Sequence, residues 1–133
     1  MLSQTAEYAL RAAVWLADHP GGPVRVGDLA SALKVPKNYL SKTMHQMARA
    51  GVLSSVRGKN GGFTLARKPT SIRLLDIVRP FDPMMDRREC VLGRPSCSDA
   101  SPCGAHERWK AVMQTTMTFF SQTTLGDLMR RER

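Results

Sequence analysis

All three cysteines of the chain lie in the segment CVLGRPSCSDASPCGAH, residues 90–106, which ends in a histidine. Cys90, Cys97, Cys103 and His106 form the pattern C-x6-C-x5-C-x2-H. Thiolates are soft ligands that suit zinc, copper(I) or iron–sulfur clusters, and an imidazole can complete a set of four ligands. Structural zinc sites favour closer cysteine pairs, whereas these spacings on a flexible loop can wrap a larger cluster. The pattern leaves open an iron–sulfur cluster, a zinc ion and uncoordinated redox thiols.

Catalytic motifs are thin elsewhere in the chain. The glycine run RGKNGG, residues 57–62, lacks the GxxxxGK[ST] order of a phosphate-binding loop. Ser41 and His45 are one helical turn apart, but no third group is evident that would orient them for nucleophilic catalysis. We therefore expect a protein that is not an enzyme.

The size and composition of the chain indicate one globular domain. It has 133 residues, of which 42% are hydrophobic, and no apolar run reaches the roughly 18 residues of a membrane span. Glu7, Arg11 and Asp18 interrupt the N-terminal segment, where a secretory signal would be apolar. Three cysteines cannot pair completely, which fits free thiols in a reducing compartment. These features predict a cytoplasmic protein with no membrane partner.

Positive charge is concentrated in the N-terminal half of the sequence. The formal net charge is +9, of which residues 1–70 contribute +7 (ten Lys or Arg against three acids). From Leu29 to Leu75 there is no acidic residue, although nine lysines and arginines fall in that stretch. Charge of one sign favours a polyanionic partner such as nucleic acid, although a solvated basic surface would have the same composition.

The basic half has the pattern of a helix-turn-helix. Apolar residues at three- and four-residue spacing predict a helix over 4–18, and a second, shorter helix over 27–34 ends before Pro36. Pro36 can begin a third helix that stops at Gly51. Two short helices joined by a tight turn are typical of this DNA-binding motif. The third helix is predicted to bury Leu40, Met44 and Met47 and to expose Lys37, Asn38, Ser41, Lys42, His45, Gln46 and Arg49.

A β-hairpin is predicted directly after the third helix. Two β-prone runs, 52–57 and 63–67, flank a Gly-rich turn that contains an Asn-Gly pair. A hairpin in this position is a wing, and its basic tip can reach phosphates or the minor groove. The predicted DNA-binding residues of the third helix and the wing are Lys37, Asn38, Tyr39, Ser41, Lys42, Arg57, Lys59 and Asn60.

The C-terminal half continues with a short helix over 72–79 and an irregular stretch over 81–104, which we call the cysteine loop. A long helix is predicted from His106 to Ser121, followed by a brief helix and a charged tail. Its apolar stripe can form a dimer interface, pack within its own subunit, or do both. The stripe consists of Trp109, Val112, Met113, Met117 and Phe120.

Several of these segments resemble a bacterial family of small dimeric winged-helix regulators that includes the iron–sulfur assembly regulator IscR and the nitric-oxide-sensing repressor NsrR. The resemblance rests on TAEYALRAAVWLA, on VPKNYLSKTMHQMARAGVLSSVRGKNGGFTLAR, on IRLLDIVRPFDP and on the three cysteines before a long helix. The wing phrase RGKNGGFTLAR is the most specific match. The resemblance covers nearly the whole chain, although the first cysteine gap of six residues is longer than in the better-known members.

The resemblance implies a mainly α fold: a winged helix-turn-helix with a small β-hairpin wing over residues 1–80, and a cluster-binding loop with a long dimerisation helix over 81–133. It implies a homodimer that binds double-stranded DNA at a pseudo-palindromic operator. Such a regulator, expected to be a repressor, would sense iron supply, redox state or nitric oxide through a 2Fe-2S or 4Fe-4S cluster. By the same resemblance, Cys90, Cys97 and Cys103 are cluster ligands, and the fourth ligand is His106 or Glu7 of the partner subunit.

Two other classes of protein remain open at this point. One is an electron-transfer iron–sulfur protein whose basic face docks an acidic partner. The other is a zinc- or thiol-based DNA-binding regulator that has no cluster.

Overall fold

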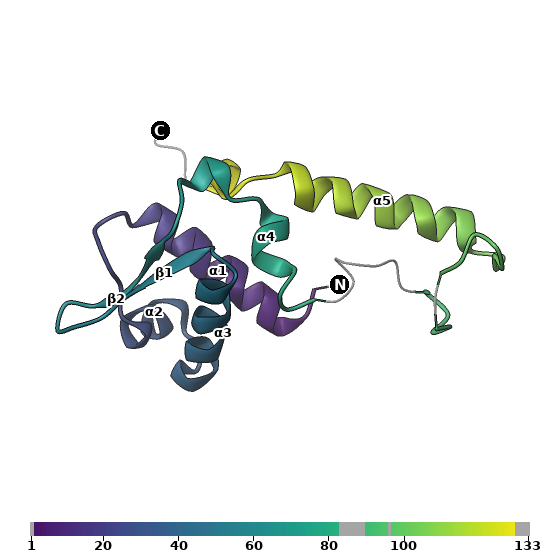
Figure 1. The fold of residues 1–133 in the computed structure, drawn as a ribbon. Coiled ribbons are helices and arrows are strands. Elements are labelled where there is room, and N and C mark those ends of the chain that lie inside the picture. Colours follow the sequence, from purple (N-terminus) through teal and green to yellow (C-terminus); the bar gives the residue numbers. More distant parts are fainter. Residues whose placement is uncertain (1, 83–89, 96, 130–133) are drawn as a thin grey trace.

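The computed structural model describes residues 2–82, 90–95 and 97–129. Its helices and strands follow one another in the order expected of a winged helix with a long C-terminal helix (Figure 1). The elements are α1 (Gln4–Asp18), α2 (Val26–Leu33), α3 (Lys37–Arg49), β1 (Leu53–Val56), β2 (Gly62–Leu65), the 3-10 helix η1 (Pro69–Ser71), α4 (Leu74–Val78), α5 (His106–Gln122) and α6 (Leu125–Leu128). The predicted fold class is confirmed, with boundaries within about two residues of those expected for most elements.

Helix α1 forms the centre of the core. Ser3 begins it, because its side-chain oxygen accepts a hydrogen bond from the backbone N–H of Ala6 at 3.1 Å. The buried face of α1 is made largely of alanine, whose small side chain lets neighbouring helices approach closely. Helices α2, α3, α4 and α6 and strand β2 all pack against it.

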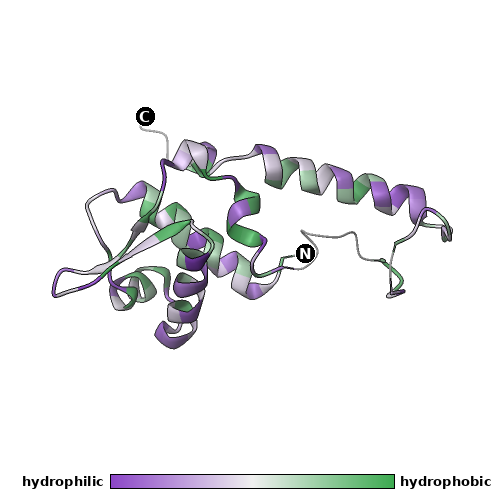
Figure 2. Cartoon of the chain, in the orientation of Figure 1, coloured by the Kyte–Doolittle hydropathy of each residue, from purple (hydrophilic) through white to green (hydrophobic). Residues whose placement is uncertain are grey.

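Helices α2 and α3 form the predicted helix-turn-helix. Lys34 ends α2 in a left-handed conformation (φ 58°), and Pro36 caps the start of α3. Leu40, Met44 and Met47 are fully buried, which confirms the predicted inner face of α3. The opposite face of α3 is strongly hydrophilic in Figure 2. The motif therefore presents polar side chains to solvent on a well-packed helix.

Strands β1 and β2 form the predicted wing as an antiparallel pair that runs from Leu53↔Leu65 to Val56↔Gly62. The segment before α2 pairs with β2 through a single-residue β-bridge, in which Val24 and Phe63 exchange both backbone hydrogen bonds at 2.9 and 3.0 Å. Gly62 makes this approach possible, because it has φ +148° and a Cβ there would lie 2.4 Å from the carbonyl oxygen of Val24.

Helix α5 extends away from the core, so that the cysteine loop and the tip of the wing lie at opposite ends of the molecule (Figure 1). After α5 the chain returns to the core: Leu125 in α6 is fully buried, and its backbone N–H donates to the carbonyl of Ile72 at 2.8 Å. The predicted division into residues 1–80 and 81–133 stays a prediction. None of the described helices combines the length and the hydropathy that a bilayer span requires.

The predicted apolar stripe of α5 is divided between two faces. Met113 and Phe120 are buried within the chain, whereas Val112 is 45% exposed. Phe119, which lay outside the predicted stripe, is 51% exposed and follows Val112 by seven residues, almost two full turns, on the same side of the helix. Part of the stripe thus packs within the subunit, and a second apolar strip faces solvent.

Candidate nucleic-acid interface and cysteine loop

The solvent-facing side of α3 carries most of the predicted DNA-binding residues. Lys37, Asn38 and Lys42 are exposed, and Ser41 is half-buried. A shallow hollow of about 400 Å³ follows this face of the helix. It is lined by Ser41, Lys42, His45, Gln46 and Arg49. The surface offers hydroxyl, amide, imidazole and cationic donors, which are the groups that contact phosphates and base edges in a major groove.

Tyr39 is the predicted DNA-binding residue with the most contacts inside the protein. Its hydroxyl forms a hydrogen bond with that of Thr5, and its ring lies edge-on to that of Tyr8 with centroids 5.5 Å apart. The side chain is nonetheless 40% exposed. Tyr39 thus joins the first turn of α3 to the first turns of α1, and its role at DNA stays a prediction.

The tip of the wing exposes three further candidates, Arg57, Lys59 and Asn60. The guanidinium of Arg25 donates to the carbonyl oxygen of Lys59, which links the start of α2 to the wing tip. Because no acidic residue occurs between Leu29 and Leu75, α3 and the wing together carry positive charge only. This arrangement favours a polyanion along both elements.

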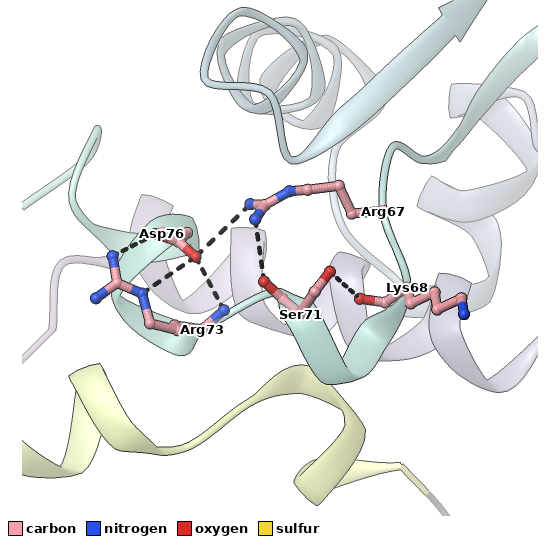
Figure 3. Close-up of polar contacts among 5 residues, drawn as sticks. All are labelled: Arg67, Lys68, Ser71, Arg73 and Asp76. Atoms are coloured by element: carbon pink, nitrogen blue, oxygen red, sulfur yellow. Dashed lines mark hydrogen bonds and ion pairs between the residues drawn. The ribbon is translucent and has the colours of Figure 1, made fainter.

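At its base, the wing is fastened to α4 by a polar network centred on Asp76 (Figure 3). Arg73 contacts this carboxylate through its guanidinium at 2.9 Å and its backbone N–H at 3.0 Å, and Arg67 lies 3.6 Å away. Arg67 also donates to the carbonyl of Ser71. Burial of Asp76 opposes its ionisation, but the hydrogen bonds from Arg73 and the charges of Arg73 and Arg67 outweigh it and lower the pKa of Asp76.

Two of the predicted metal ligands meet in the cysteine loop. The Sγ atom of Cys97 lies 3.5 Å from Nδ1 of His106, although the residues are nine apart in sequence. His106 is only 3% exposed, because it begins α5 beneath the loop. Among the residues that the structure describes, the three cysteines form no disulfide, and all three are half-buried.

The other ring nitrogen of His106 contacts a residue that the sequence analysis missed. Nε2 lies 2.7 Å from Oδ1 of Asp99, and the same oxygen accepts a hydrogen bond from Nζ of Lys110 at 3.1 Å. A carboxylate two residues after a candidate ligand was the available signal. Its spacing did not indicate contact with His106, because the loop that joins them is irregular.

The remaining candidate ligands do not converge on Cys97 and His106. Cys103 contacts His106 through the backbone, where the N–H of His106 donates to the carbonyl of Cys103 at 3.1 Å. Within residues 2–82, 90–95 and 97–129, no three His, Cys, Asp or Glu side chains are arranged to hold a metal ion. The cysteine loop therefore brings together one thiol and one imidazole, while Cys90 and Cys103 lie elsewhere on it.

Glu7 is exposed in the first turn of α1 and faces a different part of α5. It borders a hollow of about 570 Å³ between these helices, which is also lined by Leu2, Thr115, Thr116, Phe119 and Phe120. Thr115 follows His106 by nine residues, or about 13 Å along a helix. Glu7 is thus not beside His106 of its own chain, and its role as a ligand from the partner subunit stays a prediction.

One pair of donors, Cys97 and His106, has a separation that fits a single thiophilic metal atom. In a tetrahedral site, metal–sulfur and metal–nitrogen bonds of about 2.3 and 2.05 Å place the two donor atoms about 3.6 Å apart. The observed Cys97–His106 separation of 3.5 Å is close to this value. The second contact of His106, to a carboxylate, is the usual arrangement for a metal-binding imidazole.

Comparison with known proteins agrees with the helix-turn-helix. The family model of Rrf2, described as iron-dependent transcriptional regulators, matches residues 2–131. A protein of Aquifex aeolicus that carries the name HTH-type transcriptional regulator is 35% identical, over 99% of this chain and 93% of its own length. The regulator IscR of Aliivibrio salmonicida is 29% identical, over 96% of this chain and 76% of its own.

Solved structures of regulators share the fold. CymR, the global cysteine regulator of B. subtilis, superposes with a TM-score of 0.82 at 25% identity and covers 96% of this chain and 95% of its own. IscR of T. potens superposes with a TM-score of 0.76 at 24% identity and covers 99% of this chain and 93% of its own. The chain therefore belongs to the Rrf2 family, and it is a DNA-binding transcriptional regulator rather than an enzyme.

Proposed function

We propose that this protein is a homodimeric repressor that senses iron supply, redox state or nitric oxide through an iron–sulfur cluster. The pair formed by Cys97 and His106 carries this proposal, since a thiol and a buried imidazole lie at a distance suited to one metal atom. Cys90 and Cys103 lie on the same loop in the sequence and would complete a donor set of three thiolates and one imidazole if the loop closes around a cluster. Free thiols and such a cluster both suit the reducing cytoplasm.

The residues that would hold the cluster are Cys90, Cys97, Cys103 and His106. When bound, the cluster would supply a redox-active iron centre that responds to iron supply, oxidants and nitric oxide. An imidazole as fourth ligand favours a 2Fe-2S cluster, whereas Glu7 of the partner subunit in that role would favour 4Fe-4S. The burial of His106 beside Cys97 supports the first alternative.

A physical connection runs from the cysteine loop toward the DNA-binding helix. Asp82, at the start of the loop, accepts a hydrogen bond from the backbone N–H of Ser3 at 3.2 Å. Two residues later, Thr5 contacts Tyr39 in the first turn of α3. A cluster can change operator affinity only by binding one arrangement of these elements more tightly than another. The start of α1 is the element through which we expect the loop to act.

On DNA, we propose that α3 enters the major groove while Arg57, Lys59 and Asn60 of the wing contact phosphates or the minor groove. Val112 and Phe119 on the exposed side of α5 would pair two subunits. A two-fold protein binds a two-fold site, so the operator is expected to be pseudo-palindromic.

The cluster proposal is tested by purifying the protein without oxygen and measuring its visible spectrum together with iron, sulfide and zinc per chain. A brown protein with stoichiometric iron and sulfide supports the proposal, and the amounts distinguish 2Fe-2S from 4Fe-4S. A colourless protein that contains zinc, or no metal, contradicts it.

Replacing Cys97 with Ser tests the observation directly. We expect Cys97→Ser to lose the visible absorption while remaining folded, because a hydroxyl is a poor substitute for a soft thiolate. Ser101→Ala, an exposed position in the same loop, is the matched control and should keep the absorption. A normal spectrum in Cys97→Ser would show that Cys97 is not a ligand.

The second candidate function is a thiol-based regulator without a cluster. It is favoured by the same contact, since a cysteine with an imidazole 3.5 Å from its sulfur has the surroundings typical of redox-reactive cysteines. The likeness to CymR, a cysteine regulator, supports it as well. In this case the metal-free protein would bind its operator, and peroxide would change the affinity of the wild type but not of Cys97→Ser.

A further inference from the structure

His106 is buried at the start of α5, and both of its ring nitrogens have partners. Nδ1 lies 3.5 Å from Sγ of Cys97, and Nε2 lies 2.7 Å from Oδ1 of Asp99. Only 3% of the residue is exposed. Cys97 and Asp99 are two residues apart in the loop, so a short stretch of chain contacts both ring nitrogens of His106.

The two contacts are chemically unequal. An ionised carboxylate only accepts hydrogen bonds, so Nε2 must carry the hydrogen and donate it to Asp99. In the neutral ring, this leaves the lone pair on Nδ1, which is the nitrogen that faces Cys97. Nζ of Lys110, one helical turn after His106, donates to the same oxygen of Asp99 at 3.1 Å and fixes the carboxylate in place.

We propose that Asp99 is a positioning residue of the metal centre: it holds the hydrogen on Nε2, so that the lone pair of Nδ1 faces Cys97 and would be the atom through which His106 binds iron. The inference rests on the proposed function and adds the donor atom, its partner and the residue that orients it. A carboxylate on the remote nitrogen also makes the imidazole a stronger donor to the metal.

The donor atom can be identified in the wild-type protein by isotopic labelling. The full-length protein is prepared without oxygen using histidine labelled with 15N at Nδ1 only, or at Nε2 only, and the cluster is reduced for pulsed electron paramagnetic resonance. We expect a strong hyperfine coupling from the Nδ1-labelled sample and a weak one from the Nε2-labelled sample. His106→Gln identifies the source of the signal, because His19 and His45 lie on other elements and would still be labelled.

The outcomes separate this inference from the proposed function. Strong coupling from Nε2, or no histidine coupling in a protein that does hold a cluster, overturns the inference and leaves the cluster proposal standing. A protein that holds no iron or sulfide overturns the proposed function itself.

The role of Asp99 is tested by substitution. Removing an orienting carboxylate typically weakens metal binding by about 10- to 100-fold, so Asp99→Ala should release iron to a chelator at least about 10-fold faster. It should also raise the reduction potential at a fixed pH. Asp99→Asn, whose amide oxygen can still accept a hydrogen bond from Nε2, should keep Nδ1 as the donor atom. Its iron release rate and reduction potential should lie between those of Asp99→Ala and the wild type.

Glu107→Gln is the matched control for charge, since Glu107 is an exposed acid next to His106. It should leave the potential and the iron release rate close to those of the wild type. If Asp99→Ala is folded by circular dichroism and gives the same two values as Glu107→Gln, Asp99 does not position the imidazole.

Discussion

At the scale of single residues, Lys42 and Arg57 carry exposed positive charge on α3 and on the wing, respectively. We expect Lys42→Ala and Arg57→Ala each to weaken operator binding across all sequences, because a phosphate contact is lost. A lost contact also reduces the slope of log K against log salt by about 0.9 per subunit. Fluorescence anisotropy with labelled operator at several salt concentrations measures both effects.

Lys68→Ala provides the control for this experiment. Lys68 is also exposed, but it lies at the start of η1, which packs against α6. The control should keep the wild-type slope. An unchanged slope in Lys42→Ala or Arg57→Ala would remove that residue from the interface.

Asp76 is the residue whose ionisation the structure couples most clearly to folding. Its pKa is lowered from the ordinary value of 3.8, so its stabilisation is present above that value and is lost as the pH falls through the folded-state pKa. Asp76→Asn should therefore cost about 1 kcal/mol of unfolding free energy at pH 7. The difference from the wild type should shrink below about pH 4.

Urea denaturation at pH 7 and pH 3.5 measures this difference. Asp28→Asn, an exposed carboxylate in α2 outside the network, should change the unfolding free energy by less than about 0.5 kcal/mol at either pH. A penalty for Asp76→Asn that is the same at both pH values would show that its charge is not the cause.

The residue types of the candidate site could be predicted from the sequence, but their contacts could not. Cys97 and His106 were recognised by type and spacing, whereas Asp99 was missed, because an irregular loop has no period from which side-chain direction follows. Tyr39 shows the reverse case. Its place on the polar side of α3 was predictable, but its contact with Thr5 depends on how α1 packs across α3.

At the scale of elements, the wing depends on one close backbone approach. Gly62 lies where a Cβ would meet the carbonyl of Val24 at 2.4 Å. Gly62→Ala should cost about 1–3 kcal/mol, because the backbone must leave a conformation that only glycine adopts easily. It should also displace the wing from Val24 and weaken operator binding.

Thermal unfolding and operator titration together measure the effect of Gly62→Ala. The control is Gly21→Ala, in the connection before Val24, where a Cβ would meet nothing within 4 Å and the backbone is not in the left-handed region. A Gly62→Ala protein with wild-type stability and affinity would show that the β-bridge between Val24 and Phe63 is dispensable.

The hydrophobic periodicity indicates the type of each element, and glycine and proline residues mark where the elements end. The helices, the hairpin and their order along the chain were therefore predictable. The stripe on α5 was predicted less well. A period of 3.6 residues identifies an apolar side of a helix but not which part of it the rest of the chain covers. Met113 and Phe120 are covered within the subunit, while Val112 and Phe119 are not.

At the scale of the whole molecule, the described part of the cysteine loop and the tip of the wing lie at opposite ends of the folded structure (Figure 1). A signal from the loop must therefore pass through the long helix α5 or through α1, which packs against both α3 and α4. A second subunit on α5 would shorten this distance, since it could place the loop of one chain near α1 of the other. Glu7, which is exposed at the start of α1, would then lie near the cysteine loop of the partner, where its carboxylate could serve as a ligand.

The exposed strip of α5 gives the prediction that tests this arrangement. If this strip pairs two subunits as proposed, Phe119→Glu should convert the dimer to a monomer, because it places a charge on apolar surface that a partner would bury. It should cost the single chain little at a position already 51% exposed. Analytical ultracentrifugation measures the dissociation constant, which should rise at least about 10-fold. Thr118→Glu is the control, since Thr118 is exposed on another side of α5 and should leave the dimer intact. If Phe119→Glu remains a dimer of unchanged affinity, the subunits pair elsewhere, and α5 would carry no signal between them.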